Sequence, residues 1–115
     1  VDSVDHVPVQ ELGRIIRYHK AFGEKGTNVD FVEVMDKKNV RLRTYERGVE
    51  GETYACGTGA VAPGVVLKEK GLLESPMNIA TQGGETLKVY VDNDVYLEGD
   101  AHIIYTAKLH EEALI

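Results

Sequence analysis

Apolar side chains near the start of the chain recur at three- and four-residue spacing, which is the period of an α-helix. They are Val9, Leu12, Ile15 and Ile16. Pro8 stands directly before them, and proline suits the first turn of a helix because the N–H that it lacks would have no partner there. We therefore predict an amphipathic helix over residues 9 to about 20.

The period changes to two in the next part of the chain, and such alternation is typical of β-strands. Residues 29–35 predict one strand, residues 36–39 a turn, and residues 40–45 a returning strand. Arg41 and Arg43 alternate with apolar residues in the second strand. We expect both arginines on the face opposite the apolar side chains.

Glycines gather in residues 48–59, and a mostly apolar stretch over residues 58–70 follows them. Apolar residues on nearly every side of this stretch predict a helix that is buried all round. Gly71 suits the position just after its carboxyl end. Turn-forming residues separate the predicted strands of the remaining chain, which cover residues 78–81, 85–91, 95–97 and 102–107.

These elements predict an α+β fold. A curved, mostly antiparallel, barrel-like sheet wraps around one central buried helix, and an amphipathic helix lies near the start. The 115 residues fit one domain, residues 1–115. Residues 110–115 are expected to form an exposed tail.

The charge of the chain is acidic, with 13 Lys and Arg against 19 Asp and Glu and a net charge of -6. A nucleic-acid-binding surface needs a basic stripe to neutralise phosphates. The longest apolar run, residues 60–67, is much shorter than the ~20 residues that span a bilayer. We therefore expect neither nucleic acid nor a membrane as a partner. The first nine residues show no signal-peptide pattern, which predicts the cytoplasm.

The single cysteine, Cys56, lies at the expected start of the second helix. The first N–H groups of a helix have no partner within it, and the positive end of the helix dipole attracts anions. A cysteine at this point has its thiolate favoured. The stretch can therefore supply both a reactive thiol and a cradle for a carboxylate. Arg47 can hold a second carboxylate at two points, and Glu46 can accept a hydrogen bond from an ammonium group.

Each of these residues also has a plainer interpretation, which the motif alone leaves open. A lone cysteine is commonly a small, inert core residue. Cys-Gly-Thr-Gly suits a phosphate-binding loop, although it lacks the lysine of a P-loop and the third glycine of a dinucleotide fingerprint. Glu46 and Arg47 are by default a solvated charge pair, and Asn28 is by default a turn residue. The four histidines lack the spacing of zinc ligands, so we predict no metal site.

Residues 45–60 resemble, almost residue for residue, the second-cysteine motif of diaminopimelate epimerases. Residues 26–31, Gly-Thr-Asn-Val-Asp-Phe, look like the family's Gly-Thr-Asn-Val-Asn-Phe segment. Residues 81–87 resemble its Thr-Pro-Gly-Gly-Glu-Leu segment. Proline racemases share Cys-Gly-Thr-Gly but not the Tyr-Glu-Arg-Gly lead-in. The whole chain is therefore similar to the carboxy-terminal half of a diaminopimelate epimerase.

The resemblance implies a reaction without pyridoxal or another cofactor, which converts LL-diaminopimelate to the meso form for lysine and peptidoglycan precursor synthesis. In this family one cysteine removes the α-proton from one face of the carbon, and a second cysteine delivers a proton to the other face. Cys56 matches the second of these cysteines. The fold implied is one of two pseudo-symmetric halves, each a barrel-like sheet around a helix, with the site between them. The partners implied are diaminopimelate and the amino-terminal half of the enzyme, and a homodimer is compatible with the family.

The resemblance also assigns the substrate contacts. Gly57 and Thr58 match residues whose backbone N–H groups hold the reacting carboxylate. Asn28 and Arg47 match residues that bind the distal carboxylate, and Glu46 matches one that takes the distal ammonium.

One departure from the family is Pro63, where the family has small residues and often another cysteine nearby. Proline inside a helix removes one donor and crowds the carbonyl four residues back. We therefore expect the helix to begin irregularly or to bend near the carboxylate cradle. Two other functions stay open, namely a different cofactor-free racemase or isomerase of the same fold and a non-catalytic module that binds a ligand or a protein. We also expect an exposed apolar surface beside Cys56, where the missing half would dock.

The 115-residue chain by itself is expected not to epimerise diaminopimelate. Proton transfer on both faces of the α-carbon needs two flanking groups, and the chain has one cysteine. The measurement is optical rotation or chiral chromatography after incubation of the purified chain with the LL isomer. Turnover at a rate proportional to the chain's concentration would contradict this expectation.

Overall fold

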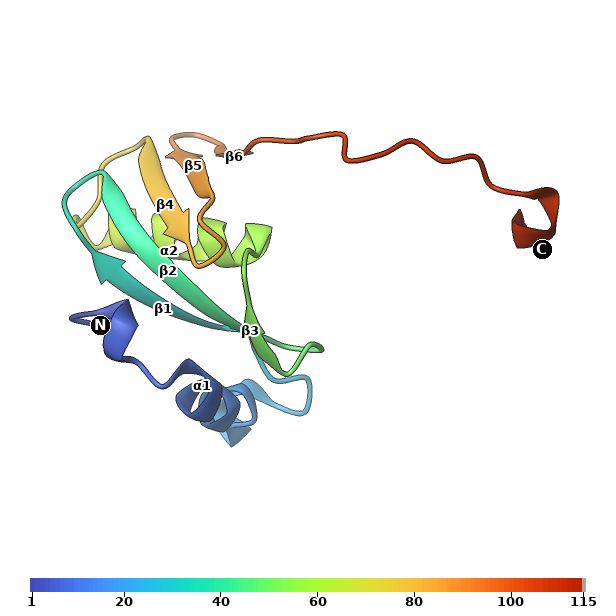
Figure 1. Ribbon diagram of the computed structural model, residues 1–115. Helices are drawn as coiled ribbons and strands as arrows, with labels where there is room; N and C mark the ends of the chain where they lie inside the picture. Colours follow the sequence, from blue (N-terminus) through green and yellow to red (C-terminus); the bar gives the residue numbers. More distant parts are fainter. Residues whose placement is uncertain (115) are drawn as a thin grey trace.

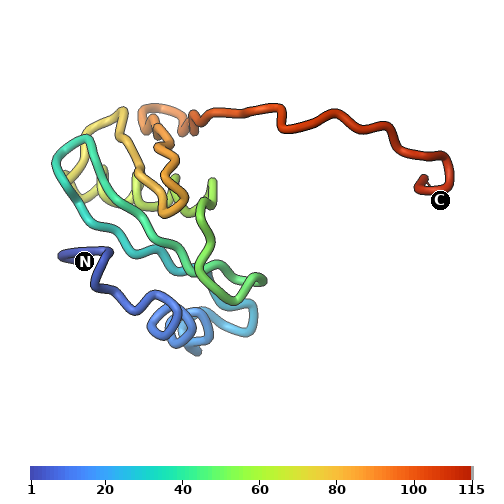
Figure 2. The backbone as a smooth tube through the Cα atoms, in the orientation of Figure 1, coloured from blue at the N-terminus to red at the C-terminus, as the bar shows by residue number. Residues whose placement is uncertain are grey.

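The computed structural model of the protein describes residues 1–114, which form one mixed β-sheet with a helix packed against each of its faces (Figures 1 and 2). The helices and strands are α1 Val9–Arg17, β1 Val29–Val34, β2 Asn39–Glu46, β3 Gly51–Thr53, α2 Gly57–Glu69, β4 Met77–Thr81, β5 Thr86–Val91 and β6 Val95–Glu98. Three short 3-10 turns complete the list, at Val4–His6, Lys20–Phe22 and Glu111–Leu114.

The sheet has the strand order β1-β2-β4-β5-β6, and β3 adds to β2 beyond this path. Neighbouring strands are antiparallel except β2 and β4, which run parallel. The predicted α+β fold with a curved, mostly antiparallel sheet is therefore confirmed. The sheet is open in this chain and does not close into a barrel (Figure 1).

The larger core lies between α2 and the sheet. It contains buried side chains from β2, β4 and β5 together with Ala60 of α2, among which Val40, Met77, Ile79 and Val89 are at most 1% exposed. Helix α2 ends as predicted, since Gly71 has φ +70 and donates its N–H to the Lys68 carbonyl. A positive φ costs glycine little, because it has no Cβ.

The second core lies on the other face, between α1 and strands β1 and β2. Val9, Val29, Phe31 and Tyr45 are buried there, and Tyr45 has no exposed surface. Gly13 of α1 lies directly on the Tyr45 ring, and a Cβ on Gly13 would be 2.5 Å from the Tyr45 Cβ. The absence of a side chain at Gly13 thus lets α1 approach the sheet closely.

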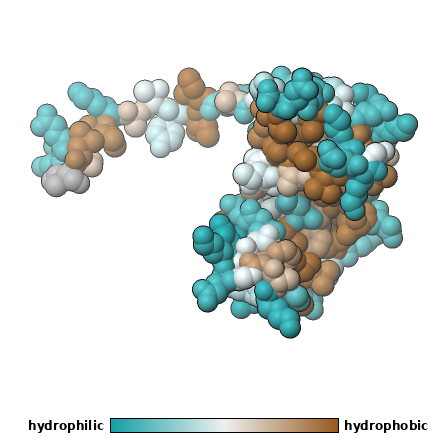
Figure 3. Space-filling view, turned by 180° about the vertical axis from the view of Figure 1, so that it is seen from behind, coloured by the Kyte–Doolittle hydropathy of each residue, from teal (hydrophilic) through white to brown (hydrophobic). Residues whose placement is uncertain are grey.

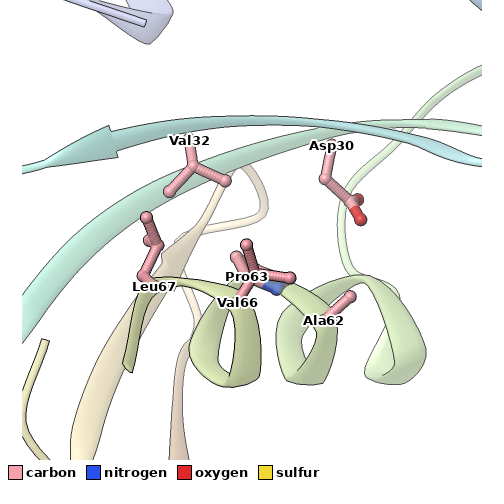
Figure 4. A pocket seen from close by; sticks show the side chains of 6 residues that line it. All are labelled: Asp30, Val32, Ala62, Pro63, Val66 and Leu67. Carbon is pink, nitrogen blue, oxygen red and sulfur yellow. The ribbon is translucent and has the colours of Figure 1, made fainter. Parts of the chain in front are cut away.

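The irregular helix start predicted from Pro63 is not found, because α2 is continuous from Gly57 to Glu69 with Pro63 inside it. Pro63 is buried, and its ring points toward β1 across a groove of about 300 Å³ (Figure 4). Asp30 and Val32 of β1 form the opposite wall. We attribute the continuous helix to the burial of Pro63, which offsets the single backbone hydrogen bond that proline removes.

Helix α2 is buried on one side only in this chain, which corrects the prediction of burial all round. Gly59, Ala60, Pro63 and Gly64 are buried, whereas Val66 is 50% exposed. The apolar residues on the open side of the helix read as core in the sequence, but no strand of residues 1–114 covers them. Figure 3 shows apolar side chains exposed on one face of the compact part of the molecule and along the projecting tail.

The predicted strand at residues 102–107 is also corrected. This segment is extended and projects away from the sheet, with no strand pairing in the described part of the chain (Figure 1). Ile103, Ile104 and Tyr105 are 80% exposed or more. The β-branched composition favours an extended backbone, but a strand also needs a neighbour with which to exchange hydrogen bonds.

Gly13→Ala is expected to lower the free energy of unfolding by about 2 kcal/mol, because the added methyl overlaps the buried Tyr45 ring and overpacking outweighs the better helix propensity of alanine. The measurement is urea unfolding at neutral pH. Glu11→Ala, at an exposed position of the same helix, is the matched control and should change stability by less than about 0.5 kcal/mol. Equal stability of the two variants would show that α1 can move away from the sheet at no cost.

Candidate functional site

The strand pairing brings separate segments of the predicted site to one end of the sheet. Val29, the first residue of β1, pairs with Tyr45 near the end of β2. Strand β3 then folds back on β2, so that Thr53 pairs with Thr44. Antiparallel pairing therefore places Asn28, the residue before β1, beside the turn after β2, which contains Arg47 directly after Glu46. Strand β3 runs back along β2, so the loop that contains Cys56 leaves β3 beside Thr44.

Asn28 and Arg47 are in direct contact. The Arg47 backbone N–H donates to Asn28 Oδ1 at 2.8 Å, and Arg47 Nη1 donates to the Lys25 carbonyl at 3.3 Å. Arg47 is exposed, whereas Asn28 and Glu46 are half-buried. The amide oxygen of Asn28 is engaged in fixing the turn, so the NH2 group of Asn28 is the part that can serve a carboxylate ligand.

Cys56 is the residue that precedes α2, and its side chain is half-buried. Its sulfur lies 3.3 Å from Thr58 Oγ1 and does not cap the helix. The Cys56 carbonyl accepts the first helical hydrogen bond, from Ala60 N at 2.9 Å. The N–H groups of Gly57 and Thr58 precede that bond and have no acceptor within residues 1–114. A thiol thus lies beside free amides at the positive end of a 13-residue helix.

The two glycines of the motif differ in their surroundings. Gly57 is exposed, whereas Gly59 is buried against β1 and β2. A Cβ on Gly59 would lie 2.9 Å from Asp30 Oδ1 and 3.2 Å from Thr44 Oγ1. The lack of a side chain at Gly59 lets the helix approach the sheet closely.

Asp30 and Thr44 form a cross-strand pair under the start of α2. Thr44 Oγ1 donates to Asp30 Oδ1 at 2.8 Å. Burial raises the pKa of Asp30 above its ordinary value, and the hydrogen bond from Thr44 opposes this shift. The sequence analysis did not single out either residue, because both read as ordinary strand positions.

The loop that leads to Cys56 is held by the β4–β5 turn. Gly83 donates its N–H to the Tyr54 carbonyl at 3.0 Å, and a Cβ on Gly83 would meet the Tyr54 Cβ at the same distance. This contact gives a structural role to the Gly-Gly segment that entered the resemblance. It places the turn after β4 next to the approach to the thiol.

An apolar surface lies beside Cys56, as expected. A cavity of about 480 Å³ is bordered by Gly57, Thr58, Val61, Ala62 and Leu97. Leu97 is 44% exposed, and the nearby Tyr54 is 76% exposed. Exposed apolar surface of this kind is typical of a face that another protein segment covers.

Two further residues at this end of the sheet, Arg17 and Glu50, were missed in the sequence. Glu50 has φ 57, which is unusual for a residue with a side chain. Its carboxylate accepts hydrogen bonds from Gly48 N at 2.9 Å, from Arg17 Nε at 3.0 Å and from Tyr45 OH at 3.3 Å. The Gly48 N–H and then Arg17 hold the pKa of Glu50 at about 2, well below its ordinary value of 4.5. In the sequence Glu50 is one of many acidic residues, and only the fold shows its partners.

No group of three or more His, Cys, Asp or Glu side chains within residues 1–114 is arranged to hold a metal ion. Over the same residues, neither helix has the length and apolar character needed to cross a bilayer.

Comparison with known proteins identifies the family. A family model described as diaminopimelate epimerase matches residues 1–104. The diaminopimelate epimerase of Aquifex aeolicus (strain VF5) is 45% identical over 118 residues, which cover 99% of this chain and 42% of the relative. That of Hydrogenobaculum sp. (strain Y04AAS1) is 47% identical over 113 residues, which cover 96% of this chain and 41% of the relative.

The chain belongs to the diaminopimelate epimerase family. Epimerases are isomerases, so the family is one of isomerases. The chain spans about two fifths of the length of these epimerases. A crystal structure of the Bacillus anthracis phenazine biosynthesis protein of the PhzF family has the same fold, with a TM-score of 0.56 at 24% identity over 84% of this chain and 32% of that chain.

Glu50→Gln is expected to make the free energy of unfolding of this epimerase-family chain depend less on pH at acid pH. A carboxylate with a lowered folded-state pKa contributes stability that is fully present above its unfolded-state pKa, here 4.5, and that is lost as the pH falls through about 2. The measurement is urea unfolding between these two pH values. Glu69→Gln is the control, because Glu69 is exposed and forms no hydrogen bond or ion pair with another side chain of residues 1–114. A profile for Glu50→Gln as steep as that of the wild type would contradict the assignment.

Proposed function

We propose that this chain provides the carboxy-terminal half of the active site of a pyridoxal-independent, two-cysteine epimerase that converts LL-diaminopimelate to the meso form. The observation that carries the proposal is the position of Cys56. Cys56 directly precedes the free Gly57 and Thr58 amides at the start of α2. This helix start lies against Asp30 and Thr44, which are two residues along their strands from Asn28 and Glu46.

The chemistry needs a base and an acid on opposite faces of the α-carbon. As a thiolate, one cysteine takes the α-proton, so that the C–H bond breaks, an S–H bond forms, and the electron pair remains on carbon and spreads into the carboxylate. The other cysteine, as a thiol, gives its proton to the opposite face. Cys56 is one member of this pair in our proposal, and the other belongs to the part of the epimerase outside this chain.

The reacting carboxylate gains negative charge as the α-proton leaves. Prearranged N–H donors stabilise such charge, because they need no reorganisation during the reaction. The Gly57 and Thr58 amides, at the positive end of α2, are suited to this task.

The other end of the substrate carries a second carboxylate and a second ammonium. In our proposal the NH2 group of Asn28 and the guanidinium of Arg47 bind the carboxylate, and Glu46 accepts from the ammonium. The direct hydrogen bond between Arg47 N and Asn28 favours this assignment over a different racemase of the same fold, because it brings the proposed distal contacts together. That the enzyme is cytoplasmic and that it forms a homodimer stay predictions.

In the complete enzyme, Cys56→Ala is expected to abolish exchange of the α-proton with deuterated solvent in at least one direction. The loss of one proton-transfer group costs about a hundredfold to ten-thousandfold in rate. Mass spectrometry measures deuterium uptake by the LL and meso isomers separately, and calorimetry measures their binding, which should remain largely intact. Tyr54→Phe, on the exposed approach to the site, is the control and should exchange normally. Unchanged exchange in Cys56→Ala would remove Cys56 from the mechanism.

A further inference from the structure

Arg17, the last residue of α1, connects three segments at the distal end of the proposed site. Its side chain is only 11% exposed. The Nε and Nη2 atoms both lie 3.0 Å from Glu50 Oε1, and Nη1 donates to the Lys25 carbonyl at 3.2 Å. The guanidinium also stacks over the Tyr18 ring at 4.4 Å. The orientation of this side chain is therefore fixed from several directions.

Glu50, the partner of Arg17, also forms hydrogen bonds that fix the turn containing Arg47. The Glu50 carboxylate accepts the N–H of Gly48, the residue after Arg47, at 2.9 Å. The Glu50 N–H donates to the Glu46 carbonyl at 2.9 Å and closes the turn. Gly48 and Glu50 both have positive φ, at 93 and 57. A left-handed residue with a side chain is strained and persists where its surroundings hold it, and the contacts of Glu50 provide that hold.

Arg17 also holds the loop that precedes Asn28. Besides the bond to the Lys25 carbonyl, the guanidinium occupies the space in which a side chain at Gly26 would stand. Lys25 in turn accepts from Arg47 Nη1 at 3.3 Å. Arg17 and Arg47 thus share one carbonyl, and the loop and the turn are tied together through it.

From this arrangement we propose that the Arg17–Glu50 ion pair is a positioning clamp for the distal end of the substrate. It sets the distance between Asn28 on one segment and Glu46 with Arg47 on the other. The inference rests on the proposed function, because it assigns a role in recognising the second amino-acid end of diaminopimelate. Neither clamp residue touches the substrate in this proposal. They act through the backbone of the two segments that do.

The physical argument is one of preorganisation. A substrate end that carries both a carboxylate and an ammonium is bound at two points only if the protein groups that bind them keep a fixed separation. Ordering flexible loops on binding would cost conformational entropy and lower the affinity for the substrate. Arg47 is exposed, and its turn contributes no side chain to either core cluster. Polar contacts therefore have to supply the rigidity that packing supplies elsewhere.

The test compares Arg17→Gln and Glu50→Gln in the complete enzyme with Arg41→Gln as the matched control. Arg41 also forms a two-partner ion pair, with Asp5 at 2.6 Å and Glu33 at 3.4 Å, but near the start of β2. We expect KM for LL-diaminopimelate to rise about tenfold or more in both clamp variants, with kcat within about threefold, because distal contacts act equally on ground and transition states. The control should leave both constants unchanged.

Two further variants sharpen the result. The double variant should be no worse than either single variant, since the two residues act as one unit. Arg17→Lys keeps the charge without the fork and should give an intermediate KM. It replaces Arg17→Gln if that variant does not fold. A fall in kcat at constant KM, or equal effects in Arg41→Gln, would overturn the clamp.

Amide hydrogen exchange tests, without any substrate, whether Arg17 and Glu50 hold the turn that contains Arg47 and Gly48. The N–H groups of Arg47 and Gly48 should exchange faster in both clamp variants, while that of Asn78, bonded to the Lys38 carbonyl at 2.7 Å, keeps its rate. Unchanged protection at Arg47 and Gly48 would overturn the clamp even in an active enzyme. Absence of turnover in the wild-type complete enzyme would instead overturn the proposed function, and the exchange rates would still test the clamp.

Discussion

The contact of Gly59 with the Asp30–Thr44 pair determines where α2 begins relative to the sheet, and the geometry of the site depends on it. A Cβ at Gly59 would lie 2.9 Å from Asp30 Oδ1 and 3.2 Å from Thr44 Oγ1, so a residue with a side chain at this position would require the hydrogen-bonded pair to shift. The helix start is therefore held at a fixed height above β1 and β2. The thiol of Cys56 and the free amides that follow take their positions from this contact.

The local elements of the fold could be predicted from the sequence because each one has a periodic pattern of its own. The alternation of apolar and polar residues predicted the bounds of β1 and β2 to within a residue or two, and Gly71 predicted where α2 ends. The contact between Asn28 and the turn of Glu46 and Arg47 could also be predicted, since one hairpin brings these two segments together. The irregular helix start predicted from Pro63 is not found, because helix propensity depends on the local sequence, whereas the burial of Pro63 depends on the tertiary fold.

The sequence could not reveal features that depend on distant partners. Residues 102–107 have the composition of a strand, but pairing requires a neighbour that residues 1–114 do not provide. The open side of α2 has the composition of a core and is exposed for the same reason. Arg17 and Glu50 are separated by 33 positions and have no pattern that links them. Their ion pair follows only from the docking of α1 against β1 and β2.

The parallel pairing of β2 with β4 has a consequence for the location of the site. The chain leaves the carboxyl end of β2, folds back as β3, and then returns through α2 to β4, the parallel neighbour of β2. In open α/β sheets, ligands bind in the crevice outside the carboxyl ends of such strands. The segments after β2 and β4, which contain Arg47 and Gly83, lie at that edge together with the loop that leads to Cys56. The proposed site in this mixed sheet with a single parallel pair thus follows the same topological rule as nucleotide-binding folds, without using their phosphate-binding glycines.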